Sequence, residues 1–235
     1  MRQEQQELRR VDYIQQKTQC DRCGTCCRKG GPALHEEDKE LVRAGHISYE
    51  NLFTVRKGEL AVSPVTNRLE PALHELVKVS GKGPSWTCLF FASAESACGI
   101  YENRPLECRV LQCWNPEKIL EVVTRGDAIC RADILNADDP VMQLILMHDE
   151  QCPPGLVEEI LTTAAARTSA DRDDMLEKAT VQVRKDLDVR RLAAEKFGLS
   201  ASAELFLLGR PLFTQVAVLG ISTMEKNGEI FLKWD

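Results

Sequence analysis

The sequence has no long apolar run and no large excess of charge of either sign. No apolar stretch approaches the roughly 20 residues that a membrane-spanning helix needs, and the first ten residues are charged and lack the apolar run of a secretory signal. The 30 basic and 36 acidic residues leave a net charge of −6, so no global field attracts nucleic acid or anionic lipid. We therefore expect a cytoplasmic protein that binds neither nucleic acid nor membranes.

Familiar catalytic motifs are also missing. The chain has no Gly-rich phosphate loop, no H-E-x-x-H helix and no G-x-S-x-G elbow. Three of its four histidines, His35, His46 and His74, are isolated in the sequence, and we expect them at the surface or in ordinary packing. The sequence therefore predicts no catalytic residue, and whether the chain is an enzyme stays open.

Cysteine, in contrast, is abundant. Four of the ten cysteines fall in one eight-residue stretch, as Cys20, Cys23, Cys26 and Cys27. So short a loop has no core to fill, whereas thiols two residues apart can turn back on one ion, as in zinc and iron–sulfur sites. Gly24 favours such a loop because it tolerates positive φ. Since cytoplasmic thiols stay reduced, this density argues for metal rather than disulfides.

A second group of cysteines follows downstream and completes the set of candidate metal ligands, which comprises Cys20, Cys23, Cys26, Cys27, Cys88, Cys98, Cys108 and Cys113. The side chains of adjacent Cys26 and Cys27 tend to diverge, which suits either two neighbouring sites or one ligand and one free thiol. Unliganded reduced thiols and a redox disulfide switch are the alternatives to metal binding.

Two further cysteines lie outside this pattern. Cys130 falls on a predicted helix, where a buried thiol acts as a small apolar side chain. Cys152 follows His148 at a predicted helix end, so the pair is either an extra set of ligands or, as we favour, two ordinary helix-end residues.

The spacing of the first cysteines bears on which metal is bound. Cys20, Cys23 and Cys26 match the first three ligands of a bacterial ferredoxin-type run, with a fourth ligand to come from the downstream group. Zinc sites more often use two C-x2-C knuckles, and only one is unambiguous here. The cofactor is therefore zinc or iron, and the run favours an iron–sulfur cluster.

The combination of C-x2-C-x2-C-C, a later Trp-Thr-Cys and the run Cys-Gly-Ile-Tyr-Glu-Asn-Arg-Pro-Leu-Glu-Cys-Arg resembles the YkgJ-type cysteine-cluster family. That family is the CxxCxxCC domain described as zinc- or iron-chelating. The resemblance covers about residues 18 to 115 and implies that the eight clustered cysteines chelate metal. FliB-type flagellin lysine methylases share the cysteine signature, and that likeness implies an iron–sulfur cluster.

Four residues near the cysteines have predicted supporting roles. The guanidinium groups of Arg104 and Arg109 offset the negative charge of a thiolate site, pair with nearby carboxylates or bind an acidic partner. Trp86 and Tyr101 are expected to shield the site from water. Three functions stay open: a structural or accessory metal-binding module, an iron–sulfur enzyme related to protein lysine methylases, and a metal or redox sensor with a protein partner.

The predicted fold class is α+β and predominantly helical. A cysteine-cluster metal-chelating domain is expected over residues 18–115, with a helical region over 116–235 packed on it. A strand at 75–80 and an antiparallel partner at 86–91 form a predicted hairpin that places Cys88 near Cys98.

Helices are predicted from apolar periodicity over residues 1–17, 34–44, 117–125, 140–149, 155–168 and 171–197. In the last of these, one face carries Leu176, Ala179, Val183, Leu187 and Leu192. Residues 205–221 form the most apolar stretch and should dock onto the core. Residues 224–234 contain Asn-Gly and predict a terminal hairpin.

Overall fold

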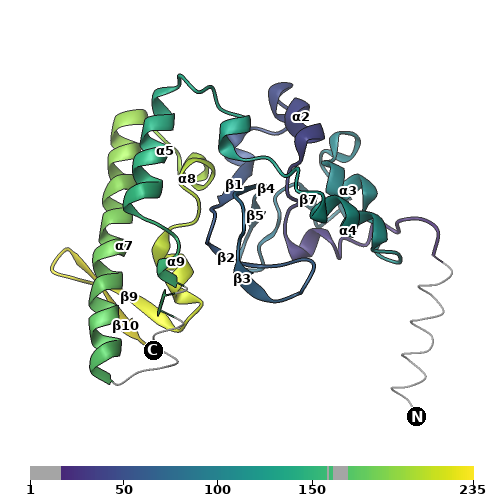
Figure 1. Ribbon diagram of the computed structural model, residues 1–235. Helices are drawn as coiled ribbons and strands as arrows, with labels where there is room; N and C mark the ends of the chain where they lie inside the picture. Colours follow the sequence, from purple (N-terminus) through teal and green to yellow (C-terminus); the bar gives the residue numbers. More distant parts are fainter. Residues whose placement is uncertain (1–16, 158, 161–168) are drawn as a thin grey trace, which may run out of the picture.

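The computed structural model describes residues 17–157, 159–160 and 169–235, and its fold is α+β with a helical C-terminal half. Short strands and helices that carry the clustered cysteines lie on one side, and the helices from residue 140 onward lie with the terminal hairpin on the other (Figure 1). The amphipathic helix predicted for residues 1–17 and most of the helix predicted for 155–168 lie outside the described residues.

The N-terminal half consists of short elements, in which η denotes a 3-10 helix. They are η1 (Cys27–Lys29), η2 (Glu36–Asp38), α2 (Lys39–Arg43), η3 (Tyr49–Asn51), β1 (Leu52–Val55), β2 (Leu60–Val62), β3 (Leu69–Pro71), β4 (Leu76–Val79), β5 (Gly81–Lys82), β6 (Thr87–Cys88), β7 (Phe91–Ala92), β8 (Ala97–Cys98), η4 (Tyr101–Asn103) and α3 (Leu106–Val110). The strands pair antiparallel in twos, as β1–β4, β2–β3, β5–β6 and β7–β8. The helix predicted for 34–44 is present as η2 and α2.

The strand predicted at 75–80 is confirmed, but its predicted pairing with 86–91 is wrong. β4 pairs with the fully buried β1, in the register Leu52↔Val79. Its other edge is also occupied, because the Val79 N–H donates to the Pro32 carbonyl at 2.9 Å. Residues beyond β4 turn instead through a shorter ladder, β5–β6, with Gly81 opposite Cys88.

The C-terminal half is built from longer helices, as predicted for residues 117–125, 140–149 and 171–197. Its elements are α4 (Glu117–Thr124), η5 (Arg131–Asp133), α5 (Pro140–Gln151), α7 (Ser169–Phe197), α8 (Ala201–Leu207), α9 (Leu212–Ala217), β9 (Ile221–Lys226) and β10 (Glu229–Trp234). The terminal hairpin is confirmed, and its Asn227 and Gly228 have φ of 55° and 79°, as a type I′ turn requires.

The inward face of α7 differs in part from the predicted one. Ala179 and Val183 are buried, but Leu192 is 52% exposed. Arg190 and Ala193 take the inward positions of the last turns, together with Asp186 one turn earlier. Apolar periodicity does not reveal this inward face, because Asp186 and Arg190 are charged.

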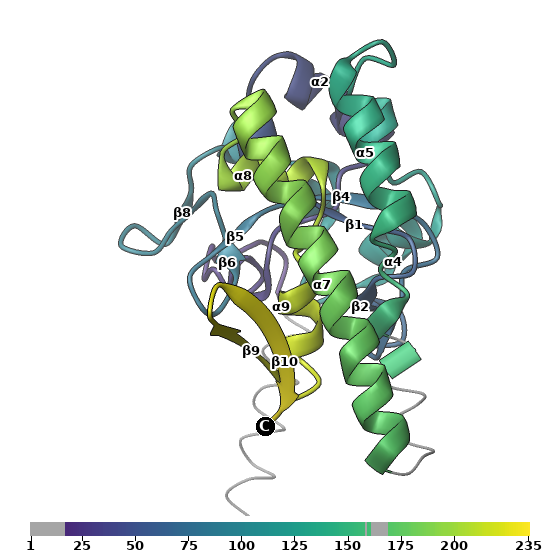
Figure 2. The same ribbon diagram turned by 90° about the vertical axis from the view of Figure 1, so that its left-hand side faces the viewer.

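Two hydrophobic clusters form the core, and α7 contributes to both. The first joins Leu52 of β1 and Phe91 of β7 to Val189 of α7 and Phe206 of α8. The second includes side chains from the N-terminal part of α7, from α9 and from the terminal hairpin, and Figure 2 shows these elements side by side. Residues 205–221 dock onto these clusters as predicted, through side chains that include Leu212. Within the described residues, no helix is both long enough and apolar enough to traverse a membrane.

Candidate metal centre

The loop that carries the first four cysteines is a tight turn with two residues at positive φ. Arg22 has φ of 53° and Gly24 has φ of 72°. The Arg22 N–H donates to the Cys20 sulfur at 3.3 Å, and the Cys23 sulfur lies 3.2 Å from the hydroxyl of Thr25. The Thr25 hydrogen bond lowers the pKa of the Cys23 thiol, which favours the thiolate that metals bind.

Phe91 of β7 forms the floor on which this loop rests. A Cβ at Gly24 would lie 2.2 Å from the tip of the Phe91 ring, so the backbone approaches the ring as closely as only glycine permits. The Arg28 guanidinium lies 5.3 Å from the centre of the same ring and donates to the Cys23 carbonyl at 2.9 Å. Phe91 itself is 2% exposed. The loop is thus fixed next to β7 and β8.

Cation–π contacts hold the loop against the second group of cysteines. The Arg22 guanidinium lies 4.3 Å from the centre of the Tyr101 ring, and the Arg104 guanidinium lies 3.7 Å from it. The Lys17 ammonium lies 5.6 Å from the Trp114 ring. These contacts place the N-terminal loop beside the chain segment that carries Cys98, Cys108 and Cys113.

Burial raises the pKa values of several thiols, and thiols from both groups of cysteines add to the effect. Burial, and after it Cys26, Cys88 and Cys98, raise the pKa of the Cys27 thiol to about 12. Burial also raises the pKa of the Cys88 thiol, with Cys98 adding to the effect. The pKa of Cys108 is raised by burial and then by Cys88. The predicted proximity of Cys88 and Cys98 is therefore confirmed, although their strands belong to different hairpins.

The donor set fits zinc or iron, because both metals take thiolate sulfur. The Cys26 and Cys27 sulfurs lie 3.9 Å apart. Within the described part of the chain, the clustered cysteines form no group of three whose sulfurs all lie within 4.8 Å of one another. Ligation would therefore draw these side chains closer than they stand here.

The four predicted supporting residues occupy different environments. Tyr101 and Arg104 contact each other, and Arg104 also donates to the Tyr101 carbonyl at 2.7 Å. Arg109 lies 3.6 Å from a carboxylate oxygen of Glu37. Trp86 is 38% exposed, and its ring meets Phe53 edge-on at 5.5 Å. Arg104 is thus a stacking partner, whereas Arg109 forms an ion pair.

A buried polar network that the sequence reasoning missed anchors α3, the helix with Cys108. Glu107 accepts from the Ala33 N–H at 2.9 Å and lies 3.3 Å from the His35 ring. Asp38, which is fully buried, accepts from the Leu106 N–H at 2.8 Å. In the sequence, the feature that could have indicated this network is Glu107, an acidic residue directly before Cys108.

His35 is therefore not isolated, contrary to the sequence-based expectation. It is 2% exposed, and its other ring nitrogen lies 2.7 Å from Asp127. Burial opposes its protonation, but the hydrogen bonds to Glu107 and Asp127 outweigh burial and raise the pKa of His35. His46 and His74 are exposed, in line with the prediction.

Cys130 also departs from its predicted setting. It precedes η5 rather than lying within a helix, and it is only half-buried. Its thiol donates to the Asp133 carboxylate at 3.1 Å. The adjacent acceptor explains why this cysteine is not a buried apolar side chain.

A second set of potential ligands lies in the C-terminal half, where His148, Cys152 and Asp186 are fully buried with ligand atoms within 4.8 Å of one another. The Asp186 oxygens already accept from His148 at 2.7 Å, from Arg190 at 3.1 Å and from the Leu212 N–H at 3.0 Å.

A metal ion among these side chains would displace those donors. Arg56 Nη1 also lies 3.4 Å from the second nitrogen of His148 and donates to the Cys152 carbonyl at 2.7 Å. An added cation would therefore stand next to two buried guanidinium groups, those of Arg56 and Arg190. Such a network is typical of a structural ion-pair cluster, in agreement with the favoured interpretation of Cys152 as a helix-end residue.

Comparison with known proteins gives a match that starts just before the cysteine loop. Residues 19–131 match the family model for CxxCxxCC, described as a putative zinc- or iron-chelating domain. No match was found among curated proteins, and none among solved structures. The matched region contains all eight clustered cysteines and extends past them through α4 to Arg131. Residues 19–131, which carry the eight clustered cysteines, are thus similar to the CxxCxxCC family.

Proposed function

We propose that this protein binds zinc or iron through its clustered cysteine thiolates, in a structural or accessory role. The supporting observation is that two groups of four cysteines, far apart in the sequence, are brought side by side. Contacts of Phe91 with Gly24 and of Tyr101 with Arg22 bring them together. The proposed ligands are Cys20, Cys23, Cys26, Cys27, Cys88, Cys98, Cys108 and Cys113.

A structural role follows from how little else holds this region together. β5, β6, β7 and β8 are two residues long, and each pairs with a single partner. So short a ladder supplies few hydrogen bonds, whereas metal–thiolate bonds contribute their binding free energy to folding. Ligation would thus fasten the loop at residues 20–27 to the segment at 88–113.

We favour an iron–sulfur cluster over zinc, because Cys20, Cys23 and Cys26 keep the ferredoxin-type spacing. Metal analysis and an absorption spectrum on protein purified without oxygen test this preference. Iron with acid-labile sulfide and broad visible absorption would support it. A colourless protein with stoichiometric zinc would replace it by zinc, and a protein without any metal would refute the proposed function.

The ligand assignment is tested by Cys23→Ser and Cys108→Ser, which remove one cysteine from each group. We expect both variants to lose metal. Cys130→Ser is the matched control, because Cys130 is half-buried and outside the cluster, and a serine hydroxyl can keep its hydrogen bond to Asp133. Full metal content in either cluster variant would remove that cysteine from the ligand set.

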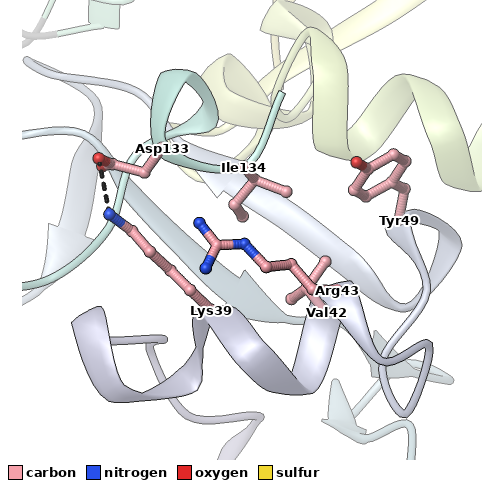
Figure 3. A pocket seen from close by; sticks show the side chains of 6 residues that line it. All are labelled: Lys39, Val42, Arg43, Tyr49, Asp133 and Ile134. Carbon is pink, nitrogen blue, oxygen red and sulfur yellow. Dashed lines mark hydrogen bonds and ion pairs between the residues drawn. The ribbon is translucent and has the colours of Figure 1, made fainter. Parts of the chain in front are cut away.

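The lysine-methylase likeness supplies an alternative, an iron–sulfur enzyme acting on a protein side chain. Such an enzyme needs a substrate pocket beside its cofactor. One pocket of the described chain, of about 150 Å³, is lined by Lys39 and Asp133, which form an ion pair, and by Arg43 and Tyr49 (Figure 3). Another, of about 430 Å³, lies between α7 and β10. None of the eight clustered cysteines lines either pocket, so we make metal binding the primary proposal.

A further inference from the structure

The eight clustered cysteines divide evenly by their exposure to solvent. One set is buried or half-buried and consists of Cys27, Cys88, Cys98 and Cys108. The other is exposed and consists of Cys20, Cys23, Cys26 and Cys113. We call them the inner and the outer thiols. Each set contains four sulfurs, which is the number that one tetrahedral thiolate site requires.

The boundary between the sets falls at a peptide bond. Cys26 belongs to the outer thiols and Cys27 to the inner thiols, and their sulfurs lie 3.9 Å apart. Because these two sulfurs differ in exposure, the pair can supply one ligand to each of two neighbouring sites.

The inner thiols share a packed environment. η1, which begins at Cys27, packs against β6, which ends at Cys88. Cys88 belongs to the first hydrophobic cluster together with Phe91, and Cys27 packs against that cluster. Cys98 lies opposite Phe91 in the β7–β8 ladder. Cys108, the fourth of these thiols, is half-buried on α3.

The outer thiols lie where the loop meets the end of the second cysteine segment. Cys20 and Cys23 flank Arg22, whose guanidinium stacks on Tyr101. Cys113 directly precedes Trp114, which receives the Lys17 ammonium. The two ends of the outer set are thus connected by the same contacts that dock the loop, but without a covering layer of apolar side chains.

We infer that the chain holds two thiolate sites, an inner one that retains its ion and an outer one that exchanges its ion with ligands in solution. This inference rests on the proposed metal binding and adds to it a division of labour. The inner ion is enclosed by the core, so its release requires local unfolding. The outer ion stands at the surface, where a competing thiol or chelator can reach it while the fold is intact.

The test uses full-length protein reconstituted with zinc without oxygen and then mixed with an excess of a chromogenic chelator. We expect about two zinc ions per chain, released in a fast and a slow phase whose rates differ by about tenfold or more. Cys113→Ser should abolish the fast phase and leave the slow phase and the melting temperature unchanged. Cys98→Ser should abolish the slow phase and lower the melting temperature.

Cys20→Ser provides a second outer variant, and Cys130→Ser a control that should keep both phases. A wild-type protein that binds one ion, or releases all its zinc in one phase, would overturn the inference while leaving the proposed function intact. So would identical release from the Cys113→Ser and Cys98→Ser proteins. A wild-type protein that binds no metal would overturn the proposed function, and the inference with it.

Discussion

Gly24 illustrates how one residue controls the position of a whole ligand loop. It combines a positive φ with a backbone approach to Phe91 that leaves no room for a Cβ. Any other residue must therefore move either the loop or the Phe91 ring, which is buried in the first hydrophobic cluster.

We expect Gly24→Ala to lower the free energy of unfolding by about 2 kcal/mol, combining a backbone cost with overpacking against a buried ring. Metal content should fall as well, because the loop can no longer lie against β7. Thermal melts and metal analysis of the purified variant measure both effects.

Gly45→Ala is the matched control for this substitution. Gly45 has φ of 76°, close to the 72° of Gly24, but a Cβ there would meet nothing within 4 Å. The control should show the backbone cost alone, about 1 kcal/mol, with metal content unchanged. Equal effects from both variants would mean that contact with Phe91 has no influence on the loop.

Asp186 is a buried carboxylate whose charge contributes to stability at acidic pH. Burial alone would raise its pKa, but the hydrogen bond from His148 and the guanidinium of Arg190 lower the pKa to about 2. A lowered pKa contributes stability above the unfolded-state value of 3.8, and this contribution disappears as the pH falls toward 2. The loss for Asp186 should be about 2 kcal/mol.

Asp186→Asn should lower the free energy of unfolding near neutral pH by about 3 kcal/mol, because the buried Arg190 loses its nearer carboxylate and keeps only Glu204, at 4.0 Å. The variant should also lack part of the wild-type decline in acid. Urea unfolding across pH checks this, with Asp188→Asn as a control in which an exposed ion pair to Arg191 is removed. A wild-type acid decline retained in full by Asp186→Asn would contradict the assignment.

At this scale the sequence points to the clustered cysteines as candidate ligands, but it does not point to the charged residues that support their segments. Thiols with C-x2-C spacing are recognisable alone, since few other roles explain them. In the sequence, Asp38, Glu107 and Arg56 are ordinary charged residues. Folding buries Asp38 and Arg56 and half-buries Glu107, each beside partners distant in the chain. Their roles depend on tertiary contacts, and no local pattern encodes those.

At the scale of elements, Tyr101 lies between two arginines and joins the cysteine loop to the downstream segment. Tyr101→Leu removes both ring contacts, with Arg22 and with Arg104, and keeps an apolar side chain. Each exposed cation–π contact contributes about 0.5–1 kcal/mol, so loss of both should lower metal affinity by about 5- to 30-fold. Competition with a calibrated chelator measures this change.

Phe231→Leu is the control for loss of a cation–π contact. Its ring lies 4.7 Å from the Arg184 guanidinium on the terminal hairpin, and Phe231 is 41% exposed. Metal affinity should not change in this variant. An equal loss in both proteins would show that the Tyr101 effect is not specific to the loop.

Helices and strands were predicted correctly where a sequence pattern extends over many residues. The prediction failed where several segments compete to pair with one strand. The helix at 171–197 and the terminal hairpin were predictable because their signals are local. The partner of β4 was not predictable in this way. Both edges of β4 are occupied, one by β1 and the other by residues 32–34, so residues 86–91 cannot pair with it. Which segment pairs with each edge of a strand depends on how the whole sheet is buried.

For the whole molecule, metal removal should loosen one part and spare another. The second hydrophobic cluster contains none of the eight candidate ligands, whereas the first contains Cys88 and packs against Cys27. Hydrogen exchange of chelator-treated protein should therefore show lost protection over 20–27 and 88–113 and retained protection in the N-terminal part of α7. Uniform loss of protection across the chain would contradict this division.

The participation of α7 in both clusters also limits how the cysteine module can be reused. A fragment that ends at residue 115 would leave Leu52 and Phe91 without the side chains of Val189 and Phe206 that cover them. To transfer the eight cysteines to another scaffold, one would therefore also have to transfer the C-terminal part of the 29-residue helix α7, which contains Val189. The spacing of the cysteines can be copied into another sequence, but the cysteine region of this chain does not have a hydrophobic core of its own.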